Sequence, residues 1–218
     1  MKTALVFGSS GLIGSHLLKF LIQSVNYNKI KLFVRSPSIS TNNKIEIIQI
    51  DFNNLNEYSN EIIGDDCYYC IGTTRKNSPN KDDYRKVELD IPKKIAHIAR
   101  SNFIKSFIFV SSGFANPKHS GEYLRYKGLV EEQLKELNFP KLGIMRPSFL
   151  MGERKDHRIG EKIGILIFKI FTPFFIGPLR KMRPIYASNV AKVMVNIPIM
   201  KLSKNIFESD EIEVLSKN

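Results

Sequence analysis

Cysteine and histidine, the residues that typically bind zinc or form disulfides, are scarce in this sequence. There are two cysteines, Cys67 and Cys70, and four histidines that lie far apart along the chain. Although C-x-x-C is a spacing of redox and metal sites, here it falls in an apolar run typical of a buried strand, where residues three apart point to opposite faces. We therefore expect no pairing of the two thiols and no metal site.

The sequence also lacks a hydrophobic run long enough to cross a bilayer. Its most apolar stretch, Ile163 to Ile176, is shorter than the roughly 20 residues that a spanning helix needs, and Lys169 and Pro173 interrupt it. A lid over a substrate, a subunit contact and plain core are the interpretations of this stretch. No signal segment precedes the first expected strand, because Met1 leads directly into it, so we expect a cytoplasmic protein.

A block of basic residues with interleaved aromatics is absent as well. Lysine and arginine outnumber aspartate and glutamate by 33 to 21, which gives a formal net charge of +12 and a pI near 9.6. Such a charge suits an anionic partner. The lysines are scattered along the chain, however, so a solvated basic surface is the better explanation, and we expect a small-molecule substrate and no specific nucleic acid.

What remains is the composition of a globular protein. The chain has 218 residues, of which 43% are hydrophobic and 25% charged, and this length is sufficient to bury a full core. It shows neither an internal repeat nor a low-complexity linker. We expect a single domain over residues 1–218, as a monomer or a homodimer, in which residues from about 149 onward contribute a small substrate lobe.

The sequence is organised around the stretch from Lys2 to Gly14. An apolar run rich in strand-forming residues stops at Gly8, and a helical pattern of apolar residues begins just after Gly11. In a dinucleotide-binding turn the three glycines would bend the chain, let the backbone approach the pyrophosphate and let the helix pack on the strand. The helix start would offer its N–H groups to the phosphates. The cofactor contacts expected here are Gly8, Ser10, Gly11, Leu12, Ile13 and Gly14.

The end of the second expected strand, Ile30 to Val34, favours one cofactor over the other. In a doubly wound sheet this tip faces the adenosine ribose, where an acid binds the 2′-hydroxyl of NAD and an arginine accommodates the 2′-phosphate of NADP. Here the strand is followed by Arg35, and no acidic residue occurs from Ile30 to Lys44. We therefore expect NADP(H) in preference to NAD(H); the alternative is a surface arginine that closes a strand.

The apolar runs farther along predict the rest of a parallel sheet. Its third to sixth strands are expected at Lys44 to Ile50, Cys67 to Ile71, Lys105 to Val110 and Leu142 to Met145. The chain after the fourth strand, at Ile71, Gly72 and Thr73, must pass close to the cofactor's ribose and phosphate. An amphipathic helix from Asp90 to Ser101 is expected to cover the sheet.

Catalytic chemistry is expected on the helix Glu122 to Leu137. Tyr123 and Lys127 are four residues apart and so lie on one face, with the phenol and the ammonium pointing the same way. The positive charge would favour ionisation of the phenol, as a general acid/base requires. The preceding strand ends in Ser111-Ser112-Gly113, and a serine there would hold a substrate oxygen toward the phenol.

The Tyr-x-x-x-Lys spacing alone is a weak signal, because the sequence has a second copy at Tyr27 and Lys31. That copy is expected to straddle a loop and the start of a strand, so it cannot place both groups on one helical face. Context favours Tyr123 and Lys127, which begin a helix directly after a strand that ends in serines. Tyr126, beside them, has no partner at the right spacing and is expected to pack.

Five motifs thus follow one another along the chain: Gly8-Ser9-Ser10-Gly11-Leu12-Ile13-Gly14, Cys70-Ile71-Gly72-Thr73-Thr74-Arg75, Ser111-Ser112-Gly113, Tyr123-Leu124-Arg125-Tyr126-Lys127-Gly128-Leu129-Val130-Glu131 and Arg146-Pro147-Ser148. In this order they make the chain resemble the atypical short-chain dehydrogenase/reductase proteins, and within them the subfamily of the Tat-interacting-protein oxidoreductases. The second and fourth motifs are the specific ones, and the resemblance covers nearly the whole chain.

The resemblance implies an α/β fold, a Rossmann-type doubly wound parallel sheet with a reduced C-terminal lobe, and NADP(H) as the cofactor. The catalytic residues that it implies are Ser112, Tyr123 and Lys127, with Ser111 as the alternative serine. The remaining cofactor contacts that it implies are Asp51 and Phe52 at the adenine and Pro147 after the sixth strand.

One position departs from the family pattern. Many members have an asparagine in the helix after the fourth strand that anchors a proton-relay water, and this chain has Glu88 there. Two hypotheses on function follow. The first is an NADP(H)-dependent oxidoreductase acting on a small carbonyl or alcohol, with a nucleotide-sugar epimerase as its near neighbour. The second is a cofactor-binding protein with little catalysis, whose NADPH occupancy sets a conformation read by a protein partner. The intact Ser, Tyr and Lys favour the first.

Overall fold

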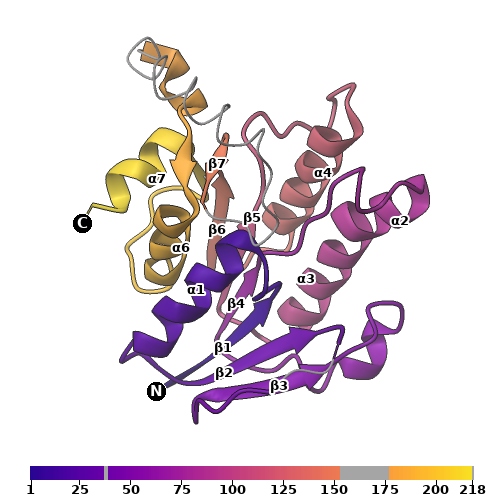
Figure 1. Ribbon diagram of the computed structural model, residues 1–218, viewed down its shortest axis with the longest axis vertical. Helices are drawn as coiled ribbons and strands as arrows, with labels where there is room; N and C mark the ends of the chain where they lie inside the picture. The colour runs from indigo at the N-terminus through magenta and orange to yellow at the C-terminus, as the bar shows by residue number, and fades with distance from the viewer. Residues whose placement is uncertain (37–38, 153–176, 218) are drawn as a thin grey trace.

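A seven-stranded parallel sheet forms the centre of the molecule (Figure 1). The computed structural model describes residues 1–36, 39–152 and 177–217. The strands are β1 (Lys2–Phe7), β2 (Tyr27–Val34), β3 (Ile45–Gln49), β4 (Asp66–Tyr69), β5 (Ser106–Val110), β6 (Lys141–Arg146) and β9 (Ile206–Glu208). They lie in the order β3-β2-β1-β4-β5-β6-β9, and each neighbouring pair is parallel. A separate parallel pair is formed by β7 (Leu150–Met151) and β8 (Ile185–Tyr186).

Helices cover both faces of the sheet (Figure 1). On one face lie α1 (Leu12–Gln23), α6 (Ala187–Asn196) and α7 (Ser209–Leu215). The other face is covered by α3 (Ile91–Ser101) and α4 (Glu122–Glu136). The chain reaches α3 through α2 (Lys81–Arg85) and the π-helix η2 (Lys86–Asp90), and two 3₁₀ turns lie at η1 (Leu55–Tyr58) and η4 (Gly177–Met182). No helix among these described segments is long and apolar enough to cross a membrane.

The central strands are apolar on both sides because each side faces a helical layer. Along β1, Leu5 and Phe7 belong to the core under α3 and α4, whereas Ala4 and Val6 belong to the core under α1 and α6. Successive strand residues point to opposite faces, so a continuous apolar run serves two cores at once. The doubly wound α/β sheet predicted from the sequence is thereby confirmed.

The strand order reverses next to β1, and this reversal places the candidate site. β1 pairs with β2 on one side and with β4 on the other. Ligands of open α/β sheets bind in the crevice at the carboxyl ends of the strands, at such a switch point. The turns at Gly8, Cys70 and Ser111 follow the carboxyl ends of β1, β4 and β5, so the segments predicted to bind the cofactor meet at one edge.

Two boundaries differ from the sequence prediction for identifiable reasons. β2 begins at Tyr27 and not at Ile30, because Tyr27 pairs with Lys2 of β1 and its buried hydroxyl bonds to Asp66. The helix expected from Asp90 is the last part of a longer helical segment. That segment starts after Asn80, whose side chain accepts from the amide of Asp82 at 2.7 Å.

The end of the chain adds two elements that the sequence analysis did not predict. β9 extends the sheet beside β6, and α7 follows it with a capping box between Glu208 and Glu211. The most apolar stretch of the sequence, Ile163 to Ile176, lies outside the described residues, and its interpretation as lid, subunit contact or core stays a prediction.

Candidate active site

The glycine-rich turn between β1 and α1 requires glycine at two positions. Gly8 has φ +88°, and a Cβ there would lie 2.8 Å from the amide nitrogen of Ile71. At Gly14 a Cβ would lie 2.0 Å from the carbonyl oxygen of Gly8, closer than any real contact. Gly8 therefore makes the turn and Gly14 lets the helix approach the strand, as the motif predicts.

The start of α1 is suited to an anion. Gly11 is its N-cap, so no side chain bonds to the first amide groups, and the first turn of this helix contains no acidic residue. The unsatisfied N–H groups and the positive end of the helix dipole face the carboxyl edge of the sheet. Ser10, Leu12 and Ile13 flank this point, and the predicted contacts of these residues and of Gly11 with a pyrophosphate stay predictions.

The predicted adenine end of the site lies after β2 and β3. Arg35 directly follows β2 and is exposed. Asp51 follows β3, and its carboxylate accepts from the backbone amide of Asn53 at 2.9 Å and from the side-chain amide of Asn54 at 3.3 Å. Phe52 packs against the core under α3. Asp51 thus stabilises the turn after β3 through hydrogen bonds to Asn53 and Asn54, which is the ordinary role of an aspartate at a strand end.

Tyr123 and Lys127 lie on one face of α4, as their spacing predicts. The Lys127 Nζ is 5.8 Å from the centre of the Tyr123 ring and 5.0 Å from that of Phe109, and it donates to the carbonyl of Val110 at 3.3 Å. Lys127 is 3% exposed, whereas Tyr123 is 39% exposed. The ammonium is therefore held at the carboxyl end of β5, and the phenol is open to a substrate.

Glu88 completes this cluster. Its Oε2 lies 3.0 Å from the Lys127 Nζ, with both side chains buried, and its Oε1 accepts the amide of Thr73 at 2.5 Å. Burial opposes the charge of Lys127, but the attraction of Glu88, Tyr123 and Glu131 outweighs it and leaves the pKa of Lys127 raised. The sequence marked Glu88 as a departure from the family, but it did not place Glu88 beside Lys127.

The two candidate serines have different surroundings. Ser111 is buried, and its Oγ donates to Glu131 Oε1 at 2.5 Å. Ser112 is half-buried, and its hydroxyl donates to the carbonyl of the adjacent Gly113 at 3.3 Å. Because the Ser111 hydroxyl is engaged inside the protein, the geometry favours Ser112 as the serine that orients a substrate.

Arg146 joins the serine turn to the end of the chain. Its guanidinium holds Glu131 in a bidentate ion pair with distances of 2.9 and 2.5 Å, and it donates to Glu208 Oε1 and to the carbonyl of Ala115, each at 3.1 Å. The hydrogen bond to Glu131 raises the pKa of Arg146 above its usual value, although burial opposes this. Pro147 follows directly, and its carbonyl accepts the amide of Gly113 at 2.9 Å. Sequence reasoning assigned no role to Glu131, although it ends a family motif, nor to Glu208, because their roles depend on contacts between distant elements.

A second ion pair ties the loop after β4 to α4. Arg75 forms a salt bridge with Glu122 at the start of α4, and its guanidinium lies 4.2 Å from the centre of the Tyr84 ring. The Tyr84 ring in turn packs against Tyr126, with centroids 6.3 Å apart. The expectation that Tyr126 packs is confirmed.

The cysteines lie where the strand pattern places them. Cys67 is buried in the core under α3 and α4, Cys70 packs against the core on the opposite face, and both are free thiols. The expectation that the two thiols point to opposite faces is therefore confirmed.

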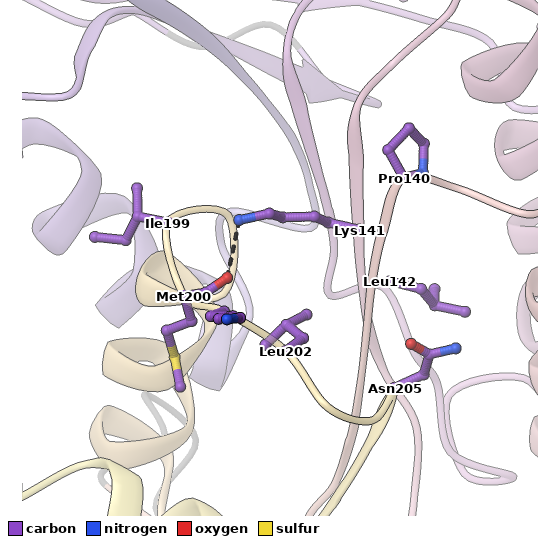
Figure 2. Close-up of a pocket in the computed structure, with 8 residues that line it drawn as sticks. Pro140, Lys141, Leu142, Ile199, Met200, Leu202 and Asn205 are labelled. Atoms are coloured by element: carbon purple, nitrogen blue, oxygen red, sulfur yellow. Dashed lines mark hydrogen bonds between the residues drawn. The ribbon is translucent and has the colours of Figure 1, made fainter.

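A cavity of about 430 Å³ lies away from this cluster, at the start of β6 (Figure 2). Lys141 on its wall donates to the carbonyls of Pro198 and Met200 at 2.7 and 2.9 Å, so its ammonium is occupied within the protein. Arg146, at the other end of the same strand, belongs to the cluster described above. The cavity therefore takes no part in the candidate site.

Comparisons with known proteins agree with this geometry. The sequence model of the NAD(P)H-binding family matches residues 8–164. Protein FMP52-1, mitochondrial, from Scheffersomyces stipitis is 31% identical over 204 residues, which cover 89% of this chain and 87% of that protein. Protein HTATIP2 from Rattus norvegicus is 32% identical over 164 residues, which cover 73% of this chain and 67% of that protein.

Solved structures share the fold at low identity. The UDP-N-acetylglucosamine 4-epimerase from Methanobrevibacter ruminantium superposes with a TM-score of 0.69 at 18% identity, over 94% of this chain and 74% of that one. The enzyme WbmH from Bordetella bronchiseptica, in complex with NAD+, superposes with a TM-score of 0.69 at 14% identity, over 100% and 80% of the two chains. These likenesses show a Rossmann-type fold. With its sequence matched from the first glycine of the turn onward and HTATIP2 among its homologues, the chain belongs to the NAD(P)H-binding family and, within it, to the atypical short-chain dehydrogenase/reductases.

Proposed function

We propose that the protein is an NADP(H)-dependent oxidoreductase that transfers a hydride to or from a small carbonyl or alcohol, with Tyr123 as the general acid/base. The observation that carries this proposal is the placement of an open phenol and a buried, charged Lys127 on one face of α4, at the carboxyl edge of the sheet. A turn that has no room for a side chain at Gly8 or Gly14 lies at the same edge.

The residues present fit a pyridine dinucleotide. The bare start of α1 suits the pyrophosphate, Arg35 suits a 2′-phosphate, and the backbone at Asp51 and Phe52 would lie at the adenine end. Ile71, Gly72 and Thr73 would line the ribose and phosphate, and Pro147 would lie near the nicotinamide end. Bound there, the reduced cofactor supplies the hydride.

The chain's own groups supply the proton and the orientation. In the reducing direction the Tyr123 phenol donates its proton to the substrate oxygen as that oxygen gains negative charge. Ser112 donates a hydrogen bond that holds the same oxygen toward the phenol. Lys127 stabilises the phenolate that remains by its positive charge, and it would also bind the nicotinamide ribose.

Replacement of Tyr123 by phenylalanine tests the proposal. General acid catalysis contributes about 10²–10⁴-fold, so Tyr123→Phe is expected to lose that much turnover with aldehydes, ketones or quinones while its NADPH affinity is kept. Tyr126→Phe is the matched control, because it removes a phenol from the same helix at a packing position. It is expected to keep its turnover.

The competing hypothesis, a cofactor-gated binding protein, predicts a different result. Wild type, Tyr123→Phe and Tyr126→Phe would then show the same negligible turnover across the substrate panel, with NADPH binding intact in all three. That outcome would refute the oxidoreductase proposal.

A further inference from the structure

Glu88 is a buried carboxylate that two separate parts of the candidate site share. One oxygen accepts the backbone amide of Thr73, in the loop after β4, at 2.5 Å. The other lies 3.0 Å from the ammonium of Lys127 on α4. The side chain of Glu88 is fully buried and that of Lys127 is 4% exposed. A single carboxylate thus links the segment predicted to line the cofactor to the catalytic helix.

The backbone around Glu88 is unusual for a helix. Glu88 lies in the π-helix η2, between α2 and α3, where the helix is wider than an α-helix by one residue per hydrogen-bonded turn. Such turns are rare and frequently occur at functional sites. Asp90, at the end of the same turn, faces outward and pairs with Arg85 at 3.6 Å on the surface. Two acids of one π-helix therefore have opposite surroundings.

The groups around Lys127 leave its charge dependent on Glu88. From the end of β4 it faces Cys70, whose thiol stays protonated because burial raises its pKa to about 12, although Lys127 lowers it. From β5 it meets the Val110 carbonyl and the Phe109 ring. On α4 itself it faces Tyr123 and Glu131.

These neighbours do not compensate the ammonium as Glu88 does. Glu131 is already paired with Arg146. On its other sides Glu88 faces two phenols, Tyr69 and Tyr84, and its negative charge raises the pKa of each, in addition to the effect of burial. Glu88 is therefore the carboxylate that directly balances Lys127.

We propose that Glu88 is a positioning residue of the active site, which keeps the Lys127 ammonium charged and fixed beside Tyr123 and attaches the Thr73 backbone to the same point. This inference rests on the proposed function for its role in catalysis. The carboxylate would take the place of the family's relay asparagine with a different task, since it provides charge and anchorage and not a site for a relay water. A buried ammonium that has lost its counter-charge favours the neutral amine.

The test measures the protonation of Lys127 directly, without cofactor. The whole protein is labelled with ¹³C and ¹⁵N at lysine, the Lys127 signal is identified by its loss in Lys127→Arg, and its shift is followed against pH. In wild type the signal is expected to stay at the ammonium position up to about pH 10, the ordinary range for lysine. In Glu88→Gln, whose amide oxygen can still accept from Thr73, the midpoint is expected to fall by about two to three pH units, to about pH 8.

Two further variants separate charge from structure. Glu88→Asp keeps the charge and is expected to restore the wild-type titration in large part. Asp90→Asn removes an equal charge from the exposed side of the same turn and is expected to leave the Lys127 signal unchanged. The proposal is overturned if Glu88→Gln titrates like wild type, or if Asp90→Asn shifts Lys127 as far as Glu88→Gln does.

Cofactor binding provides a second pH profile. Wild type is expected to bind NADPH equally well at about pH 7 and about pH 9, whereas Glu88→Gln is expected to lose roughly tenfold in affinity over this interval as Lys127 loses its proton.

If Glu88→Gln fails to fold, the double variant Glu88→Gln/Lys127→Met is measured in its place, because the double variant leaves no unpaired buried charge. It is expected to bind NADPH as Lys127→Met does, and a tenfold further loss would overturn the proposal. Absence of NADPH binding in wild type would refute the proposed function. The cofactor-free titration of Lys127 tests the positioning role of Glu88 independently of that function.

Discussion

The two Tyr-x-x-x-Lys pairs of this chain place the same residues in opposite settings. Tyr27 and Lys31 lie on β2, where the phenol is buried and donates to Asp66 at 2.7 Å, while the Lys31 ammonium donates to the carbonyl of Glu61. Tyr123 and Lys127 lie on α4, where the ammonium is buried and the phenol is open. Both residues of the first pair lie within β2, and not astride a loop as the sequence predicted. Residues four apart share a face of a regular strand, but a register shift beside Tyr27 places it on the same face as Ile30, and so opposite to Lys31. On the helix the two groups face each other.

The electrostatic partners of the two phenols differ in the same way. Burial and the negative charge of Asp66 raise the pKa of Tyr27 well above its ordinary value, so this phenol stays protonated and serves as a hydrogen-bond donor within the core. Tyr123 instead lies beside an ammonium. The first phenol is a structural hydrogen-bond donor, whereas the second is the group that we propose as the general acid/base. The spacing therefore indicates chemistry only on a helix at the carboxyl edge of the sheet.

Removing the two lysines gives the largest expected difference between the pairs. Lys127→Met leaves Glu88 buried without its counter-charge and is expected to reduce the free energy of unfolding by about 3–5 kcal/mol. Lys31→Met removes a surface contact and is expected to change it by no more than about 0.5 kcal/mol. Urea unfolding measures the stability of both variants. Equal losses would show that the buried Lys127–Glu88 pair matters no more to stability than a surface contact does.

Arg35 extends the comparison to cofactor selection at the carboxyl edge. Arg35→Ala is expected to lose about 1.5–3 kcal/mol of NADPH binding, which is tenfold or more, and to spare NADH, because the guanidinium would pair with the 2′-phosphate alone. Lys31→Ala is the control, because Lys31 lies on the strand that Arg35 follows but away from the carboxyl end of that strand. Calorimetry that found equal losses for NADPH and NADH would refute a role for Arg35 in cofactor choice.

The smallest expected effect concerns the phenol of Tyr27, at the amino end of β2. Tyr27→Phe removes the hydroxyl that bonds to Asp66 and to Tyr68, but Asp66 keeps its ion pair with Lys2. The free energy of unfolding is expected to fall by about 1–2 kcal/mol, with turnover unchanged. A loss of turnover in this variant comparable to that of Tyr123→Phe would contradict the separation of the two pairs.

The fold was predictable because its signals are local. The apolar runs identified the six main strands to within a few residues, and the glycines at 8 and 14 predicted a turn whose geometry has no room for a side chain. The spacing of Tyr123 and Lys127 predicted a shared face in the same way. Each of these inferences needs only neighbours within a turn or a strand.

The partners of the candidate site were not predictable for the opposite reason. Glu88 reaches Lys127 from a π-helix between α2 and α3, and no periodicity in the sequence predicts such a turn. Only the hydrogen bond from Ser111 to Glu131 distinguishes the role of Ser111 from that of Ser112. Glu131 is held in turn by Arg146 at the end of β6. Contacts between elements far apart in sequence decide these roles, and the spacing of residues along the chain does not predict such contacts.

The guanidinium of Arg146 has a consequence for the order in which the molecule can be completed during synthesis. The close contacts at Gly8 and Gly14 come from residues 8–71, but α1, which follows this turn, packs against α6 near the end of the chain. The serine turn is braced by Arg146, and Arg146 takes its second carboxylate from Glu208, on the last strand of the sheet. Both the glycine turn and the serine turn therefore depend on late parts of the chain, and a chain that stops short of β9 leaves Arg146 with a single acid.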